Sequence, residues 1–225
     1  MTVSVVIPTL NEEGVLAATI ARARQFGVRE IVVADGGSTD ATRAIAARDA
    51  DLLLSARRGR AAQMNAGAAR AQGDVLLFLH ADTLLPDGFA DAVVAACNEP
   101  QVVGGRFDVV LEPSSPLIRL TGELINRRSR LTRISTGDQA IFIRRVVFEQ
   151  LEGYADIPLM EDVDLSRRMK RAGRIACLRQ RVTTSARRWH KHGVVRTILL
   201  MWSLRALYFF GVSPAQLQRV YANTR

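Results

Sequence analysis

The stretch VSVVIPTLNEE, Val3–Glu13, begins with a run of apolar, mostly β-branched residues and becomes polar after Pro8. A second stretch of similar design, VVADGGSTDAT, follows at Val32–Thr42. Short apolar runs that end in turn-forming residues are typical of buried strands. In both stretches the polar residues come directly after the strand, where parallel sheets bind their ligands. The two stretches therefore predict a sheet with its functional residues at the strand ends.

Strands and helices alternate on both sides of these stretches. Strands are expected at Val3–Ile7, Glu30–Ala34, Leu52–Ser55 and Val75–Leu79. Helices are expected at Glu12–Arg24 with Asn11 as its N-cap, at Thr39–Arg48 and at Arg60–Ala71. This alternation predicts an α/β fold of the Rossmann-like kind, with a mostly parallel central sheet and helices on both faces.

The second half of the chain is less regular. Strands are expected at Gly104–Leu111 and Ala140–Ile143, and a helix at Asp162–Ala172 that ends at Gly173. No linker is visible, so we expect one domain over residues 1–190.

Residues 191–225 are expected to form a C-terminal appendage, which contains the apolar stretch Val194–Phe210. This stretch is too short and too interrupted by arginines for a clean membrane span. It fits packing against the domain or a homodimer contact. The alternative is a peripheral membrane contact, in which an interfacial helix is anchored by its aromatic side chains.

The net charge is +9, from 31 Lys and Arg residues against 22 Asp and Glu, and the excess is concentrated in the second half. Such a balance suits an anionic partner: a nucleotide diphosphate, a phospholipid surface or nucleic acid. The sequence has no helix-turn-helix, RNP or zinc signature, so we expect no nucleic-acid partner.

Cysteine usage and the N-terminus indicate where the protein works. Cys97 and Cys177 lie far apart, without the spacing of a disulfide framework or a zinc site, which indicates free thiols in a reducing compartment. No basic region or cleavage site accompanies the first apolar run, so we interpret it as a strand and not a signal peptide. We expect a cytoplasmic protein, with the inner face of the membrane as an alternative location.

Acidic residues stand at three successive places. Asp35 ends the second expected strand, Asp82 follows the fourth, and Glu161 and Asp162 stand where the loop meets the helix expected at Asp162–Ala172. A sugar-nucleotide transferase needs carboxylates to bind the nucleotide, to hold a divalent metal against the leaving diphosphate, and to take a proton from the acceptor hydroxyl. Hard oxygen ligands suit Mg²⁺ or Mn²⁺. Each carboxylate alone is more typical of a cap or turn, so their order carries the prediction.

Further segments complete a pattern that resembles the family 2 inverting glycosyltransferases of the GT-A fold, over roughly Val3–Gly173. Besides the two stretches quoted above, the segments are RGRAAQMNAGAARAQGD (Arg58–Asp74), FLHADT (Phe78–Thr83), GDQAIFIRR (Gly137–Arg145) and MEDVDLSRR (Met160–Arg168). FLHADT and the later SARRW (Ser185–Trp189) are similar to the rSAM/selenodomain-associated, or arsenosugar-type, subgroup. The resemblance implies metal-assisted transfer of a sugar from a nucleoside-diphosphate sugar to an acceptor hydroxyl.

The resemblance also implies roles for individual residues. The nucleotide sugar would be bound by Pro8, Thr9, Asn11, Glu12, Asp35, Gly59, Arg60 and Asn65. Asp82 would hold the metal ion, and Asp162 would be the catalytic base with Glu161 beside it. Asp138 and Gln139 match a loop near the acceptor.

One position departs from the family pattern, because His80 stands where the metal motif usually has its first Asp. A neutral imidazole would shift the preference from Mg²⁺ towards Mn²⁺, or His80 would only hydrogen-bond the ribose or diphosphate. The departure also leaves open a catalytically weak protein that binds nucleotide sugars.

Three basic residues complete the predicted site. His190 is a candidate second metal ligand, and Arg188 or its neighbour Arg187 would pair with the diphosphate. Arg106, after Gly104 and Gly105, is an anion-binding candidate, although two glycines equally fit a β-bulge.

A sugar-phosphate nucleotidyltransferase is an alternative with a similar α/β layout. Such an enzyme would have a glycine-rich loop with Arg and Lys after the first strand, where it grips a triphosphate. This chain has Pro-Thr-Leu-Asn-Glu-Glu at that place, which counts against the alternative.

Overall fold

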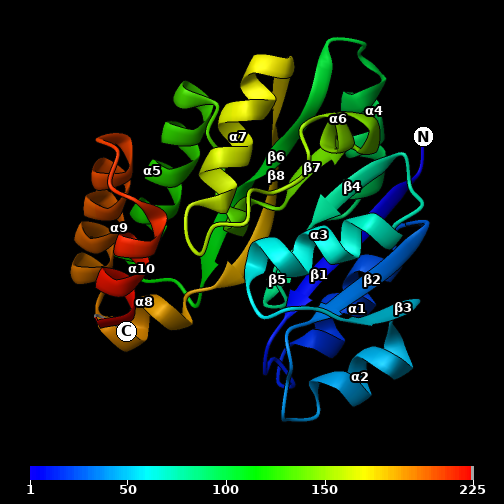
Figure 1. The fold of residues 1–225 in the computed structure, drawn as a ribbon, viewed down its shortest axis with the longest axis horizontal. Coiled ribbons are helices and arrows are strands. Elements are labelled where there is room, and N and C mark those ends of the chain that lie inside the picture. Colours follow the sequence, from blue (N-terminus) through cyan, green and yellow to red (C-terminus); the bar gives the residue numbers. More distant parts are fainter. Residues whose placement is uncertain (224–225) are drawn as a thin grey trace.

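The computed structural model describes residues 1–223, apart from the side chains of residues 188, 191, 192, 222 and 223. It contains an eight-stranded sheet that is covered by helices (Figure 1). The strands are β1 Val3–Thr9, β2 Glu30–Asp35, β3 Leu52–Ser55, β4 Val75–Phe78, β5 Thr83–Leu84, β6 Val102–Glu112, β7 Ile141–Arg144 and β8 Arg174–Ser185. Their order in the sheet is β3-β2-β1-β4-β7-β6-β8-β5.

Most of the sheet is parallel, as the sequence predicts. β1 pairs in parallel with both β2 and β4, β2 with β3, and β6 with β8. β7 runs antiparallel to β4 and β6, and β5 runs antiparallel to β8. The strands that carry the predicted site therefore end on the same edge of the sheet.

Ten helices connect and cover the strands in the described part of the chain. They are α1 Leu16–Arg24, α2 Thr42–Asp49, α3 Arg60–Arg70, α4 Phe89–Asn98, α5 Pro116–Thr132, α6 Arg145–Gln150, α7 Glu161–Ala172, α8 Arg187–His192, α9 Val194–Phe209 and α10 Pro214–Asn223. A short 3₁₀ turn, η1, spans Gly137–Gln139.

Alternating residues of β1 divide the core into two layers. Val5 lies in one cluster with Leu16 of α1 and Phe89 of α4, while Val6 lies in the other with Met64 of α3 and further residues of α7. Side chains of successive strand residues point to opposite faces, so a strand that is apolar at every position is buried on both.

The first predicted helix begins later than expected. α1 starts at Leu16 and has no side-chain cap, so the prediction that Asn11 caps a helix from Glu12 was wrong. The N–H of Asn11 donates to the Ser38 hydroxyl (2.9 Å), and the N–H of Glu12 donates to the Thr42 hydroxyl (2.7 Å). These backbone groups are therefore satisfied by the loop after β2 and not by a helix.

The C-terminal helices pack against the start of α7. Leu204 of α9 and Leu217 of α10 form a small core with Met160 and Val163. In Figure 1, α9 and α10 (orange to red) lie at one end of the molecule, beside α5. For the apolar stretch Val194–Phe210, two of the predicted roles were packing and a homodimer contact. The structure shows packing of this stretch against α7. No helix within residues 1–223 has the length and apolarity needed to cross a bilayer.

Candidate functional site

The carboxyl ends of β1 and β2 bring Thr9 and Asp35 side by side, because the two strands pair in parallel with these residues in register. Asp35 is fully buried. It accepts hydrogen bonds from the N–H groups of Gly37 and Ser38 (both 3.0 Å), the Ser38 hydroxyl, and Arg43 (3.0 Å). Burial raises the pKa of Asp35, but the hydrogen bonds from Ser38, Arg43 and Gly37 together outweigh it and hold the pKa below its ordinary value. Asp35 therefore stays ionised and organises the loop after β2.

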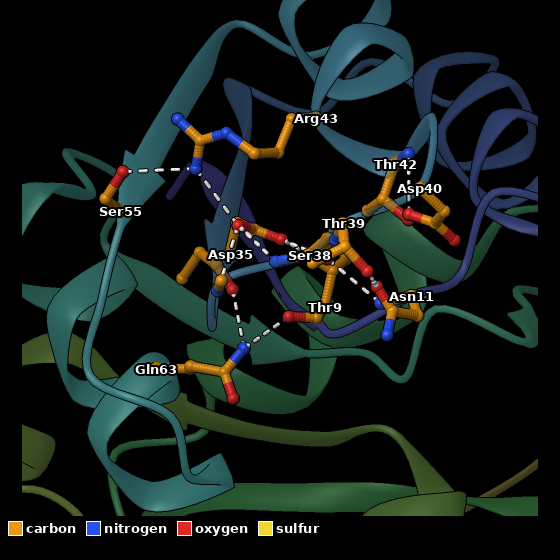
Figure 2. Close-up of polar contacts among 12 residues, drawn as sticks. Thr9, Asn11, Asp35, Ser38, Thr39, Asp40, Thr42, Arg43, Ser55 and Gln63 are labelled. Atoms are coloured by element: carbon orange, nitrogen blue, oxygen red, sulfur yellow. Dashed lines mark hydrogen bonds and ion pairs between the residues drawn. The ribbon is translucent and has the colours of Figure 1, made fainter.

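The loops after β1 and β2 are joined to each other and to α3 (Figure 2). The N–H of Thr39 donates to the side-chain oxygen of Asn11 (2.9 Å). The buried amide of Gln63, on α3, donates to the carbonyl oxygens of Thr9 (2.7 Å) and Ala34 (2.9 Å). These three segments form one connected wall of the site.

Arg187 bridges two carboxylates at the end of the sheet. Its Nη2 atom lies 3.3 Å from Oε2 of Glu12, in the loop after β1, and 3.8 Å from Oδ2 of Asp82, in the loop after β4. The Arg187 side chain is 62% exposed, so little packing holds it there. A positive charge is thus placed at the corner where the sequence predicts a metal ion.

His80 is paired with an aspartate of η1. Its Nδ1 atom lies 3.2 Å from Oδ1 of Asp138, and its side chain is only 13% exposed. A Cβ atom on Gly137 would lie 2.4 Å from Nε2 of His80. Glycine is therefore required at 137 for η1 to approach the imidazole this closely.

The residues around Asp82 fit a metal ion only in part. Where side chains are described, no group of three or more His, Cys, Asp or Glu residues is placed to hold a metal ion. Mg²⁺ at phosphate sites is commonly held by one or two carboxylates, with substrate oxygens and water as its other ligands. Asp82 therefore fits a cation whose other ligands come from a diphosphate and water. The described residues do not form a site that would hold the cation without them.

Glu161 and Asp162 begin α7, directly after Met160, whose backbone is left-handed with φ of 71°. The carboxylate of Asp162 accepts hydrogen bonds from the N–H groups of Gly137 (2.9 Å) and Val163 (2.7 Å). The first of these bonds fixes the start of α7 against η1.

The two carboxyl groups form a buried, mutually repelling pair. Burial and, after it, the charge of Asp162 raise the pKa of Glu161 to about 7, against the opposing charge of Arg60. Burial likewise raises the pKa of Asp162, although the hydrogen bonds from Gly137 and Val163 work against it. Carboxyl groups that titrate near neutral pH are suited to accept a proton during catalysis.

A cavity of about 1030 Å³ reaches from the sheet edge to Thr136 and Asp138, which flank the glycine that binds Asp162. Neither Glu161 nor Asp162 is among its described lining residues. Its lining includes Pro8, Thr9, Glu12, Gln63, Asp82 and Arg187 from the sheet edge, Arg60, His80, Thr136 and Asp138 near η1, and residues of α5 and α9. Ligand pockets usually enclose about 300–1,000 Å³. The cavity is therefore large enough for two substrates to meet in it.

Eight predicted site residues lie on the cavity wall: Pro8, Thr9, Glu12, Arg60, His80, Asp82, Asp138 and Arg187. Others support the wall from behind. Asn65 binds the backbone of Tyr154 through both side-chain atoms (2.8 and 2.9 Å), and Gly59 is the residue before α3, with φ of 139°. Gln139 is buried and forms a capping box with Thr136 across η1.

Arg106 does not bind an outside anion, which corrects the prediction from sequence. Its side chain is fully buried, pairs with Asp108 and donates to the carbonyl oxygen of Asn126 (3.2 Å). The glycines before it explain the error, because a Cβ atom on Gly104 would lie 2.3 Å from the carbonyl oxygen of Phe142. They let β6 approach β7 and do not form an anion-binding turn.

Two residues after β8 were predicted to be ligands: His190 of the metal ion and Arg188 of the diphosphate. Nε2 of His190 lies 3.1 Å from the carbonyl oxygen of Pro113, and His190 is absent from the described cavity lining, so the geometry does not support it as a metal ligand. The side chain of Arg188 lies outside the described residues.

Sequence reasoning did not identify Gln63 or Arg128 as site residues. Gln63 lies inside an alanine-rich helix, where a single amide gives no signal before the fold is known. Arg128 belongs to a cluster of arginines that was interpreted mainly as a solvated face. Helical spacing is the signal that was available, because Thr121, Leu124, Ile125 and Arg128 fall on one side of α5 and line the cavity.

Comparison with known proteins identifies the sequence family. The family described as Glycosyl transferase family 2 matches residues 4–150, which is more than half of the chain. A PGL/p-HBAD biosynthesis glycosyltransferase of Mycobacterium tuberculosis is 36% identical over 170 residues, covering 67% of this chain and 62% of that protein. An uncharacterized glycosyltransferase of the same species is 33% identical over 125 residues, covering 55% and 56%. The chain thus spans less than two thirds of the length of these relatives.

Solved structures share the fold. Staphylococcus aureus TarS, residues 1–349, matches with a TM-score of 0.65 at 17% identity, covering 83% of this chain and 61% of that one. A mannosyltransferase of Pyrobaculum calidifontis, in complex with GDP-Man and Mn²⁺, matches with a TM-score of 0.62 at 23% identity, covering 80% and 56%. TarS has also been solved in complex with UDP-GlcNAc. At these identities the likeness concerns the fold.

Proposed function

The chain belongs to the family 2 glycosyltransferases, and from that premise we propose that it moves a sugar from a nucleoside-diphosphate sugar to an acceptor hydroxyl with inversion at the anomeric carbon. The observation that carries the proposal is the cavity that joins Glu12 and Asp82 at the sheet edge to Asp138, next to the Gly137 N–H that holds Asp162. A donor diphosphate and an acceptor need such a shared space.

The donor occupies the sheet end of the cavity in this proposal. The wall of Pro8, Thr9 and Glu12, which Asn11, Asp35 and Gln63 hold in place, binds the nucleoside. Arg60 and Arg187 line the cavity and bring positive charge to the diphosphate. Solved neighbours of the same fold in complex with UDP-GlcNAc and with GDP-Man support a nucleotide-sugar donor.

A divalent cation, Mn²⁺ or Mg²⁺, is proposed at Asp82 together with the donor diphosphate. Bound there, it would neutralise the charge that develops on the leaving diphosphate. Glu12 lies across Arg187 from Asp82, and His80 is held by Asp138, so neither is assigned as a ligand. The Mn²⁺ in the mannosyltransferase complex supports the choice of metal.

Asp162 is the proposed base that takes the proton of the acceptor hydroxyl, with Glu161 beside it and with burial and the charge of Asp138 raising its pKa. Asp162 is held by the N–H of Gly137, between the cavity-lining residues Thr136 and Asp138. Because a backbone N–H holds the Asp162 carboxylate, its position does not depend on ordering a second flexible side chain.

The narrower subgroup that FLHADT and SARRW indicate is not supported by the comparisons, and the proposal does not depend on it. A cytoplasmic location and a single domain over residues 1–190 also stay predictions.

The experiment is a thermal-shift screen of UDP-, GDP-, dTDP- and CDP-sugars, each with and without Mn²⁺. We expect a metal-dependent rise in melting temperature with one nucleotide class, because a ligand that binds only the folded state stabilises it. Asp162→Asn should keep this shift and lose transfer and donor hydrolysis by about 10²–10⁴-fold, the usual contribution of a general base. Binding without turnover in the unmodified chain would favour a protein that only binds nucleotide sugars, and binding of none of them would refute the proposal.

A further inference from the structure

The half of the cavity between α5 and α9 is built differently from the half at the sheet edge. From α5 it is lined by Thr121, Leu124, Ile125, Arg127, Arg128, Leu131 and Thr132, and from α9 by Ile198, Met201, Trp202 and Arg205. Each set has helical spacing of three and four residues, so two helix faces look into one space. Its lining is therefore mostly apolar, with arginines among the apolar side chains.

This half of the cavity opens to the surface through apolar side chains. Leu124 is 44% exposed, Leu131 85% and Trp202 61%, although all three line the cavity. Leu117 and Leu120 continue the exposed apolar side of α5, and Leu199 continues that of α9. Contiguous exposed apolar surface of this kind marks a site for a ligand, a membrane or another protein.

Among the three arginines that line this half of the cavity, Arg127, Arg128 and Arg205, Arg128 is the one with buried, unpartnered nitrogen atoms. Its Nε and Nη2 atoms are buried and have no hydrogen-bond partner among the described residues. Buried guanidinium nitrogens normally find an acceptor, because an unpaired one forfeits its hydration without compensation. An anionic group in the cavity would supply the missing acceptors. A phosphate suits this role, because a guanidinium binds two phosphate oxygens through parallel hydrogen bonds.

Arg128 lies near the proposed catalytic end of α7. Arg128 lines the same cavity as Thr136 and Asp138, and the glycine between those two residues donates its N–H to Asp162. Burial lowers the pKa of Arg128 to about 10, against the charge of Asp162, which raises it. The anion at Arg128 would therefore belong to the molecule whose hydroxyl Asp162 deprotonates, which is the acceptor.

From these contacts we infer that the acceptor is an anionic lipid, whose hydrocarbon chain lies between α5 and α9 and whose phosphate group is bound by Arg128. This inference rests on the proposed function and names the class of its second substrate. The apolar rim admits the chain from a membrane surface, and the positive charge of Arg128 selects an anionic head group over a neutral one.

The test uses decyl phosphate as the probe. Decanol represents the hydrocarbon half without the phosphate, and glycerol 1-phosphate represents the phosphate half without the hydrocarbon chain. Binding to the full chain is followed through tryptophan fluorescence, because Trp189 and Trp202 both line the cavity. We expect decyl phosphate to bind at least tenfold more tightly than either half, with a blue shift of the emission. Trp202→Phe should remove most of that shift.

Arg128→Gln is the decisive variant, with Arg119→Gln as its matched control, since Arg119 is an exposed arginine of α5 outside the cavity lining. Arg128→Gln should weaken decyl phosphate binding at least tenfold, leave the dissociation constant of the donor nucleotide within twofold, and raise the melting temperature of the ligand-free chain. Arg119→Gln should change none of these.

Three results would overturn the inference. The first is equal binding of decanol and decyl phosphate, and the second is unchanged binding of decyl phosphate to Arg128→Gln. The third is a loss of donor nucleotide binding in that variant, which would assign Arg128 to the donor diphosphate. Failure of nucleotide sugars to bind the unmodified chain would instead refute the proposed function, so the two failures are distinguishable.

Discussion

At the scale of single residues, Arg187 decides the charge of the corner between Glu12 and Asp82. Its guanidinium lies 3.8 Å from Asp82, so a cation that binds Asp82 has to compete with it. Removal of Arg187 should tighten the binding of Mn²⁺ in the absence of nucleotide by about fivefold, which corresponds to roughly 1 kcal/mol for a partly exposed ion pair.

Isothermal titration of Arg187→Ala with Mn²⁺ measures this effect. Arg181→Ala is the control, because Arg181 pairs with Glu123 on the surface and is absent from the described cavity lining. Weaker Mn²⁺ binding in the Arg187 variant would show that the guanidinium supports the cation site and does not compete for it.

Glu161 links the site to stability through its titration. Its pKa is raised from 4.5 to about 7 in the folded chain, so the folded state binds more protons than the unfolded state between these pH values. Stability is therefore expected to fall as pH rises from 4.5 to about 7, by roughly 3 kcal/mol at most for this group, and to stay lowered above that. Glu161→Gln should gain that stability at pH 8 and little of it at pH 4.5.

Urea denaturation at the two pH values checks this prediction. Glu149→Gln is the control, since the Glu149 carboxylate is largely exposed. If Glu161→Gln were less stable than the unmodified chain at pH 8, partners in the folded state would have to compensate the cost of burying the Glu161 charge.

At the scale of elements, the predicted strands and helices of both halves are found near their predicted bounds, but several elements of the second half were not predicted. β3 has the bounds that its apolar run indicates, and α3 differs from the prediction by one residue. β8 was not predicted, because Arg174, Arg179 and Arg181 interrupt its alternation. Its pairing with β6 comes from the tertiary fold, which overrides local propensity in sheets.

The residues of the candidate site were likewise predictable only in part. Asp35, Asp82 and Glu12 were predictable because they stand directly after strands, where parallel sheets present their ligands. The hydrogen bond from Arg106 to the carbonyl oxygen of Asn126, and the position of Arg128 in the cavity, depend on α5 packing beside β6. Contacts between elements that are distant in sequence leave no local pattern to interpret.

The packing of β6 against β7 depends on a glycine. A Cβ atom on Gly104 would lie 2.3 Å from the carbonyl oxygen of Phe142 and 2.8 Å from Cα of Ile143. Because both atoms belong to the backbone of β7, Gly104→Ala is expected to cost about 3 kcal/mol, the upper end of the usual cost of overpacking.

Chemical denaturation compares this variant with Gly14→Ala, where an added Cβ atom meets nothing within 4 Å. We expect the Gly14 variant to stay within about 0.5 kcal/mol of the unmodified chain, as surface substitutions usually do. Equal stability of the two variants would mean that the β6–β7 approach is not close in solution.

At the scale of the whole molecule, positive charge and exposed apolar side chains occur together at the end formed by α5 and α9. The net charge of the chain is +9, and α5 alone carries Arg119, Arg127, Arg128 and Arg130. Leu131 of α5 and Phe209 of α9 are 85% and 72% exposed. An amphipathic surface with basic residues binds anionic bilayers through about 1 kcal/mol for each basic group near the surface, besides its apolar contacts.

We therefore expect the chain to sediment with vesicles that contain phosphatidylglycerol and not with vesicles of phosphatidylcholine alone. Raising the salt from 0.05 M to 0.5 M should release most of it, because the screening length shortens well below 10 Å. Trp202→Ala should reduce binding, while Leu84→Ala, a change at an exposed leucine of β5, should not. Binding that ignores lipid charge and salt would show that apolar contact alone holds the chain to the vesicle, and the arginines of α5 would then have no part in bringing it to its acceptor.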